Sequence, residues 1–169
     1  MRPALPWLAL AAAAAALLIG RGHGSSTPAR GSTLHARVLR VVDGDTIQVR
    51  LDGGRVERVR YIGIDTPESV KPGTPVQCFA KKASHYNASL VAGRPVTLRL
   101  DAEQRDRYGR LLAYVYTSPP TPTFVNRALV AKGYARTLTI PPNVSHADEF
   151  ARLARRARED GMGLWRACE

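Results

Sequence analysis

Short strand-like segments joined by tight turns constrain the fold of this chain more than any other feature of its sequence. The clearest turn is Asp52-Gly53-Gly54, a composition typical of the connection in a β-hairpin. It separates residues 46–51 from residues 56–64, two segments rich in strand-forming residues. Residues 34–42 form a similar segment just before them, joined through Asp43-Gly44-Asp45. The first part of the fold is therefore predicted to be three consecutive antiparallel strands.

The rest of the chain alternates between helical and strand patterns. Strands are predicted over residues 95–100 and 111–116, and helices over residues 76–91 and 124–132, with Gly93 and Gly133 as their stop signals. A third helix is indicated by the apolar stripe Phe150, Leu153, Ala154 and Ala157. Five short strands with helices inserted late predict a small closed Greek-key barrel with helical additions, which is an α+β fold.

The N-terminal segment is predicted to be an export signal rather than part of the fold. Arg2 precedes an apolar run over residues 8–19, whose length suits a signal peptide better than a spanning helix of about 20 residues. Extending the run over residues 4–20 allows a signal anchor, so cleavage and a membrane tether stay open. We assign residues 1–22 to the signal peptide or anchor, 23–33 to a flexible linker and 34–167 to the folded domain, in a secreted or extracytoplasmic protein.

The chain is strongly basic, with a net charge of +11. Residues 1–33 hold three arginines and no acidic residue, so the folded part carries +8. A basic folded domain indicates a polyanionic partner, either nucleic acid or an acidic membrane surface. Solubility alone is the alternative explanation, and charge does not decide between them.

Three clusters carry residues suited to phosphodiester chemistry: Asp43-Gly44-Asp45-Thr46, residues 60–68, and Asp106-Arg107-Tyr108-Gly109-Arg110. Asp45 and Asp65 supply hard oxygen ligands, which suit Ca²⁺ or Mg²⁺ better than zinc. Arg60 and Arg110 carry planar donor groups that match phosphate oxygens. Glu68 is a candidate base that accepts a proton from an attacking water. Each cluster alone could be a simple turn or an ion-paired loop, but their conjunction predicts metal-assisted attack on a phosphodiester.

The stretch from Arg60 to Glu68 sets a geometric requirement. Arg60 and Asp65 are an odd number of positions apart, so an unbroken strand would point them to opposite faces. Gly63 is the candidate position for a bulge or kink that re-aims one of them. Pro67 ends the strand and places Glu68 at a rigid corner.

The ordered set of motifs resembles the staphylococcal nuclease (thermonuclease) family over essentially residues 34–167. The matching segments are residues 42–46, Arg60 with residues 64–68, residues 106–110 with 112–114, and residues 125–126 with 128–130. The resemblance implies a five-stranded OB-fold β-barrel with three α-helices. It also implies Ca²⁺-dependent hydrolysis of DNA and RNA that leaves 3′-phosphate ends.

The resemblance also implies a role for each matching residue. Asp45, Asp65 and the backbone carbonyl of Thr66 correspond to the calcium ligands, and Asp43 to an acidic position near the metal. Arg60, Glu68 and Arg110 correspond to the catalytic residues, while Arg107 and Tyr108 correspond to positions that meet the terminal phosphate of a nucleotide. The chain departs from the family at residues 136–142, where Thr139 stands in place of an aromatic residue, so weaker base stacking is expected.

Cys78 and Cys168 are the only cysteines of the chain. An even number of cysteines in an exported protein favours a disulfide, here closing a loop of 90 residues, over two unpaired thiols. The protein is expected to be a monomer. Two other functions stay open: an inactive nucleic-acid-binding module of the same fold, and a membrane-tethered scaffold that uses its basic surface on lipids.

Overall fold

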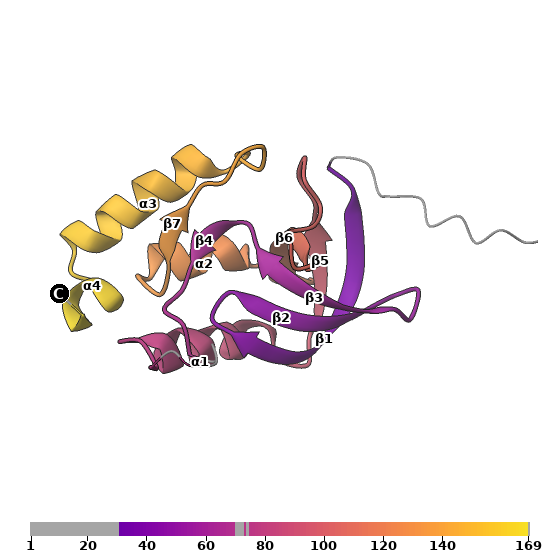
Figure 1. Cartoon of the computed structure of the whole chain (residues 1–169), viewed down its shortest axis with the longest axis horizontal. Helices are drawn as coiled ribbons and strands as arrows, with labels where there is room; N and C mark the ends of the chain where they lie inside the picture. The colour runs from indigo at the N-terminus through magenta and orange to yellow at the C-terminus, as the bar shows by residue number, and fades with distance from the viewer. Residues whose placement is uncertain (1–30, 70–72, 74, 169) are drawn as a thin grey trace, which may run out of the picture.

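The computed structural model describes residues 31–69, 73 and 75–168, so the predicted export segment and most of the linker lie outside the described residues. Five strands form a closed barrel in the order β1-β2-β3-β6-β5 (Figure 1). Their bounds are β1 Thr33–Asp43, β2 Thr46–Leu51, β3 Val56–Tyr61, β5 Pro95–Arg99 and β6 Leu111–Thr117. The predicted five-stranded barrel is confirmed.

Barrel closure depends on two pairings between distant parts of the chain. Strand β3 runs parallel to β6, with Val59 opposite Leu111, and β1 pairs antiparallel with β5, with Ala36 opposite Val96. Residues that alternate along the strands point inward, and Ile47, Val49, Val59, Leu98 and Val115 are fully buried. Burying each such side chain stabilises the fold by about 1.5–3 kcal/mol.

The strand predicted over residues 56–64 is interrupted in the structure. Strand β3 ends at Tyr61, and β4 (Gly63–Asp65) pairs antiparallel with β7 (Arg136–Leu138), a strand that the sequence pattern did not indicate. Gly63 has a φ of 79°, which favours glycine. A Cβ at this position would lie 2.8 Å from the ring of Phe150. The chain therefore turns out of the barrel at Gly63 and carries Asp65 with it.

The three predicted helices are present as α1 (Ala80–Val91), α2 (Val125–Ala131) and α3 (Ala147–Glu159), and a one-turn helix α4 (Leu164–Ala167) follows them. The start predicted for the first helix, residue 76, is wrong. Phe79 has a φ of 69°, which an α-helix does not tolerate, so the helix begins only at Ala80. Figure 1 shows α3 and α4 on the side of β7 that faces away from the barrel.

Two buried asparagines connect the helices to the barrel. Asn87 of α1 accepts a hydrogen bond from the Tyr61 hydroxyl at 2.9 Å and donates one to the carbonyl of Asp43 at 3.1 Å. Asn126 of α2 accepts from the N–H of Val115 and donates to the carbonyl of Ile62, both at 2.9 Å. Both amides are fully buried, so these bonds satisfy groups whose burial would otherwise destabilise the fold.

Among the residues that the structure describes, no helix is both long and apolar enough to cross a membrane. The predicted signal anchor over residues 4–20 falls outside that part of the chain.

Candidate functional site

Arg60 lies between two carboxylates that reach it from different elements. Its Nη1 is 2.9 Å from Oδ2 of Asp45, in the turn before β2, and its Nη2 donates to Oδ1 of Asp65, at the end of β4, at 2.8 Å. Nη1 also donates to the carbonyl of Ile64 at 2.9 Å. The turn at Gly63 permits the contact between Arg60 and Asp65, because residues 60 and 65 of a continuous strand would face opposite sides.

Asp45 is enclosed by donors. Its Oδ2 accepts hydrogen bonds from the backbone N–H of Thr66 at 2.8 Å and from the Thr66 hydroxyl at 3.1 Å, and its Oδ1 accepts one from the Thr46 hydroxyl. Burial raises the pKa of Asp45, and the positive charge of Arg60 opposes that rise. The turn can approach Thr66 this closely because residue 44 is glycine: a Cβ on Gly44 would lie 2.6 Å from Oγ1 of Thr66.

The carboxylates of Asp45 and Asp65 are hard oxygen donors, the type of ligand that Ca²⁺ takes in proteins. In the described part of the chain no group of three His, Cys, Asp or Glu side chains could hold a metal ion, so a site here needs a backbone donor as well. Asp45 and Asp65 contact different nitrogens of the Arg60 guanidinium group, so both carboxylates lie around one cationic group. The carbonyl of Thr66, next to Asp65, is the candidate third oxygen. A set made only of oxygen donors suits Ca²⁺.

Arg60 also lines a pocket of about 460 Å³ together with Arg107, Tyr108 and Arg110. Arg110 is held in place by Asp106, whose Oδ2 accepts from its Nε at 2.6 Å. The guanidinium groups of Arg107 and Arg110 lie 4.9 Å and 5.4 Å from the centre of the Tyr108 ring, which is itself exposed. Three arginines thus line the pocket, and two of them lie against an exposed aromatic ring, an arrangement suited to a phosphate-bearing ligand.

Glu68 lies on the short segment that follows β4. Two residues before it, Thr66 bonds to Asp45; one residue after it, the Ser69 hydroxyl donates to Oδ1 of Asp43 at 2.6 Å. The buried carboxylate of Asp43 thus attaches the segment of Glu68 to the end of β1. Among the described residues, Asp43 makes no side-chain hydrogen bond with Asp45 or Asp65. The structure places Glu68 on the segment between Thr66, which bonds to Asp45, and Ser69, which bonds to Asp43. Its role as a base stays a prediction.

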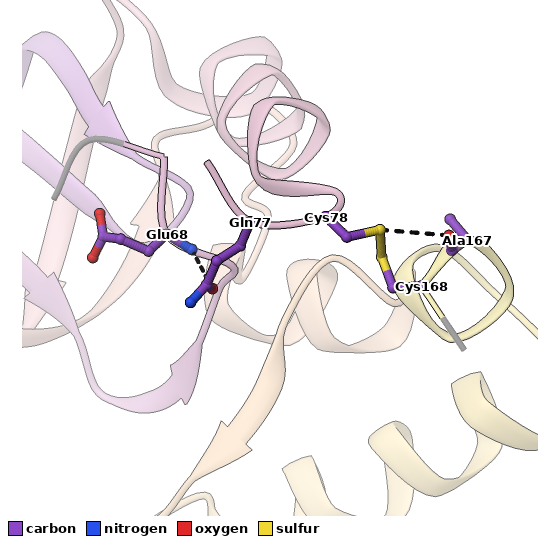
Figure 2. Close-up of a disulfide and its surroundings, with 5 residues drawn as sticks. All are labelled: Glu68, Gln77, Cys78, Ala167 and Cys168. Carbon is purple, nitrogen blue, oxygen red and sulfur yellow. Dashed lines mark hydrogen bonds between the residues drawn. A yellow bond between two sulfur atoms is a disulfide. The ribbon is translucent and has the colours of Figure 1, made fainter. Parts of the chain in front are cut away.

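Gln77 holds the backbone of Glu68 on both sides. The N–H of Glu68 donates to Oε1 of Gln77 at 2.8 Å, and the N–H of Gln77 donates to the carbonyl of Glu68 at 3.0 Å. The next residue, Cys78, forms a disulfide with Cys168. Figure 2 shows the Glu68 carboxylate pointing away from Gln77 and from the disulfide. The disulfide therefore connects the C-terminal end of the chain to the segment that presents Glu68.

Sequence reasoning missed the apolar wall of the pocket. Leu138 and Ile140 line it, and both are exposed. Thr139, expected at the position of an aromatic side chain, is not among the described residues that line the pocket. Alternation of apolar and polar residues over 138–140 was the available signal, because alternate residues of an extended segment share a face.

Comparison with known proteins identifies the family. A family model described as "Staphylococcal nuclease homologue" matches residues 58–167. The chain is 40% identical over 141 residues to the thermonuclease of Staphylococcus intermedius, which covers 83% of this chain and 80% of the relative. It is 38% identical over 128 residues to Endonuclease YncB of Bacillus subtilis, which covers 75% of this chain and 59% of the relative. With its closed barrel and a family match over more than half of its length, the chain belongs to the staphylococcal nuclease family.

Proposed function

We propose that this protein is a calcium-dependent endonuclease that hydrolyses DNA and RNA and leaves 3′-phosphate ends. One observation carries the proposal: Arg60 contacts both Asp45 and Asp65 and also lines the same pocket as Arg110. A cation site and a phosphate site thus share one residue. The thermonuclease and endonuclease names of the relatives support the same reaction class.

The cation would be held by Asp45, Asp65 and the backbone carbonyl of Thr66. When bound, a calcium ion supplies a Lewis acid that polarises a phosphate oxygen. Arg60 neutralises part of the negative charge of the two aspartates, which lowers the free-energy cost of keeping Asp45 ionised in a buried position. The same arginine is oriented by its carboxylate contacts, so its remaining donors are positioned before substrate binds.

The cleavage step divides among three side chains. Glu68 accepts a proton from the attacking water as the new bond to phosphorus forms. The bond from phosphorus to the 5′ oxygen breaks, the 5′ oxygen takes a proton from solvent water, and the phosphate stays on the 3′ side. Arg60 and Arg110 bind the phosphate oxygens, whose negative charge grows in the transition state. Asp106 fixes the Arg110 guanidinium at 2.6 Å, so little reorganisation is needed.

Arg107 and Tyr108 bind the terminal phosphate of the substrate. Arg107 Nη2 donates to the Tyr108 hydroxyl at 2.7 Å, so the two side chains present one polar surface at the pocket. The aliphatic wall of Leu138 and Ile140 contacts the base without ring stacking, which favours low base selectivity.

Digestion of single- and double-stranded DNA and RNA, with Ca²⁺ or with a chelator, tests the proposal. We expect cleavage only with Ca²⁺, and 3′-phosphate product ends. Glu68→Gln should lower kcat by about 10²–10⁴-fold, and Arg110→Ala by about 10²–10³-fold. Arg152→Ala, an exposed arginine of α3, is the matched control and should leave kcat unchanged.

Two outcomes would count against the proposal. Undiminished cleavage in chelator would exclude the metal assignment. Tight binding of nucleic acid with no cleavage under any condition would instead favour an inactive binding module of the same fold.

We further propose that the protein is exported and acts as a monomer. The apolar run over residues 8–19 supports export. N-terminal sequencing of the protein recovered from the culture medium and from the membrane fraction would tell cleavage from a retained anchor. Sedimentation analysis would test whether the purified protein is a monomer.

A further inference from the structure

Four arginines of the barrel project from one face of the sheet formed by β1, β2 and β3. Inward positions of these strands, such as Val38, Val49 and Val59, are buried, so the residues that alternate with them face outward. The outward set includes Arg37 and Arg40 on β1, Arg50 on β2 and Arg58 on β3, all of them exposed. We call these four residues the arginine face.

The strand register brings the charges of the arginine face close together. Arg37 lies directly opposite Arg50, and Gln48 lies between Arg40 on one side and Arg58 on the other. Like charges directly opposite each other on neighbouring strands destabilise a sheet. A bound polyanion would relieve this repulsion.

Among the residues that the structure describes, no acidic side chain forms an ion pair with the arginine face. Within the described part of the chain the structure records no ion pair for any of the four, and their recorded side-chain bonds are from Arg37 to the carbonyl of Gly93 and from Arg40 to Gln48. Glu57, the acid next to Arg58 in sequence, faces the other way and is paired with Arg55 and Arg105. The arginine face therefore keeps its positive charge available to an external partner.

The arginine face leads directly to the pocket. Arg58 and Arg60 are two residues apart on β3, so they share a face and lie about 7 Å apart. Arg50 pairs with Val56, four residues before Arg60, which places it about 13 Å from Arg60 along the strand. One strand of a DNA duplex advances about 3.4 Å per phosphate along the helix axis, so Arg58 and Arg50 lie about two and about four nucleotides from Arg60.

We propose that the arginine face binds the phosphate backbone of a nucleic acid from about two to about four nucleotides beyond the phosphate held at Arg60. The inference rests on the proposed function, since it extends the substrate-binding surface of the same site. An anionic membrane would also be attracted to such a face. Its continuity with Arg60 and the pocket favours the nucleic acid, because only a chain-like polyanion can occupy the pocket and the face together.

The arginines of α3 provide a matched control. Arg152 and Arg155 are exposed as Arg50 and Arg58 are, but they lie on a helix outside the barrel (Figure 1). The double variants Arg50→Gln/Arg58→Gln and Arg152→Gln/Arg155→Gln lose the same charge. None of these four side chains makes a recorded hydrogen bond in the described part of the chain, so both variants should unfold thermally like the wild-type protein.

The test measures binding of the full chain to a fluorescent single-stranded DNA of about 12 nucleotides, by anisotropy, in chelator, at several salt concentrations. Each lost phosphate contact reduces the magnitude of the negative slope of log affinity against log salt by about 0.7 for single strands. We expect a reduction of about 1.4 for Arg50→Gln/Arg58→Gln and less than half of that for the control. Binding of a nucleoside monophosphate, which is too short to reach the arginine face, should be unchanged in both variants.

The outcomes separate this inference from the proposed function. If the barrel variant and the control have equal slopes, or if binding of the nucleoside monophosphate falls as much as that of the longer DNA, the inference is overturned. Loss of binding to phosphatidylserine vesicles alone, with DNA binding intact, would also overturn it. Because binding is measured without cleavage, absence of nuclease activity would contradict the proposed function and leave this measurement valid. In an active enzyme, the barrel variant should raise KM for long DNA several-fold with kcat unchanged.

Discussion

Replacing both cysteines by serine should lower the free energy of unfolding by several kcal/mol. The disulfide joins residues that are 90 positions apart, so it restricts the unfolded chain far more than a short loop would. The chain-entropy relation gives about 4.6 kcal/mol for a loop of this length, and removing a native disulfide from a small secreted domain costs about 2–5 kcal/mol. We therefore expect a loss of about 2–5 kcal/mol for Cys78→Ser/Cys168→Ser.

Guanidinium chloride unfolding, followed by far-ultraviolet circular dichroism, measures this loss. The wild-type protein kept in excess dithiol reductant is the internal control, since it lacks the same bond without a substitution, and its unfolding midpoint should match that of the variant. Two results would refute the reasoning: a change below about 1 kcal/mol, or alkylation of both cysteines in the unfolded wild-type protein without prior reduction.

Three further predictions address the site and its support. Gln77→Ala removes the acceptor for the N–H of Glu68 and should lower kcat about tenfold with little change in KM. Gln77→Glu retains an acceptor oxygen and should restore most of the rate. Equal kcat values for Gln77→Ala and the wild-type protein in steady-state assays would contradict this prediction. The hydrogen bond from Arg105 lowers the pKa of Glu57 below its ordinary value of 4.5. The stabilising contribution of Glu57 is therefore present above pH 4.5 and is lost as the pH falls through its folded-state pKa. The free energy of unfolding should fall less steeply with decreasing pH in Glu57→Gln than in the wild-type protein, and identical curves would argue against the Arg105–Glu57 ion pair. Gly63→Ala places a side chain at a position with a positive φ and close to α3. It should lower the free energy of unfolding by more than about 1 kcal/mol in thermal unfolding, and unchanged stability would contradict this prediction.

Local sequence determined most of the barrel strands and their turns. The Asp52-Gly53-Gly54 turn, the segment Thr46–Leu51 and the helix stop at Gly93 follow from residue type and short-range patterning, and the structure has them where the pattern predicts. These features depend on backbone preferences and on one buried face, and both are visible within about ten residues. The chemical character of the site was readable for the same reason, because a carboxylate or a guanidinium keeps its chemistry in any fold.

Only the tertiary structure decided which of these groups meet. Strand β4 exists because its partner β7 lies some 70 residues later in the chain, and three residues alone show no strand signal. The ion pair of Arg60 with Asp65 depends on the turn at Gly63, where the ring of Phe150 leaves no space for a side chain. Helix α1 starts at Ala80 because Phe79 leaves the helical conformation beside the disulfide, which again joins distant parts of the chain. In each case the deciding contact joins residues far apart in the sequence, so the pattern of neighbouring residues cannot predict it.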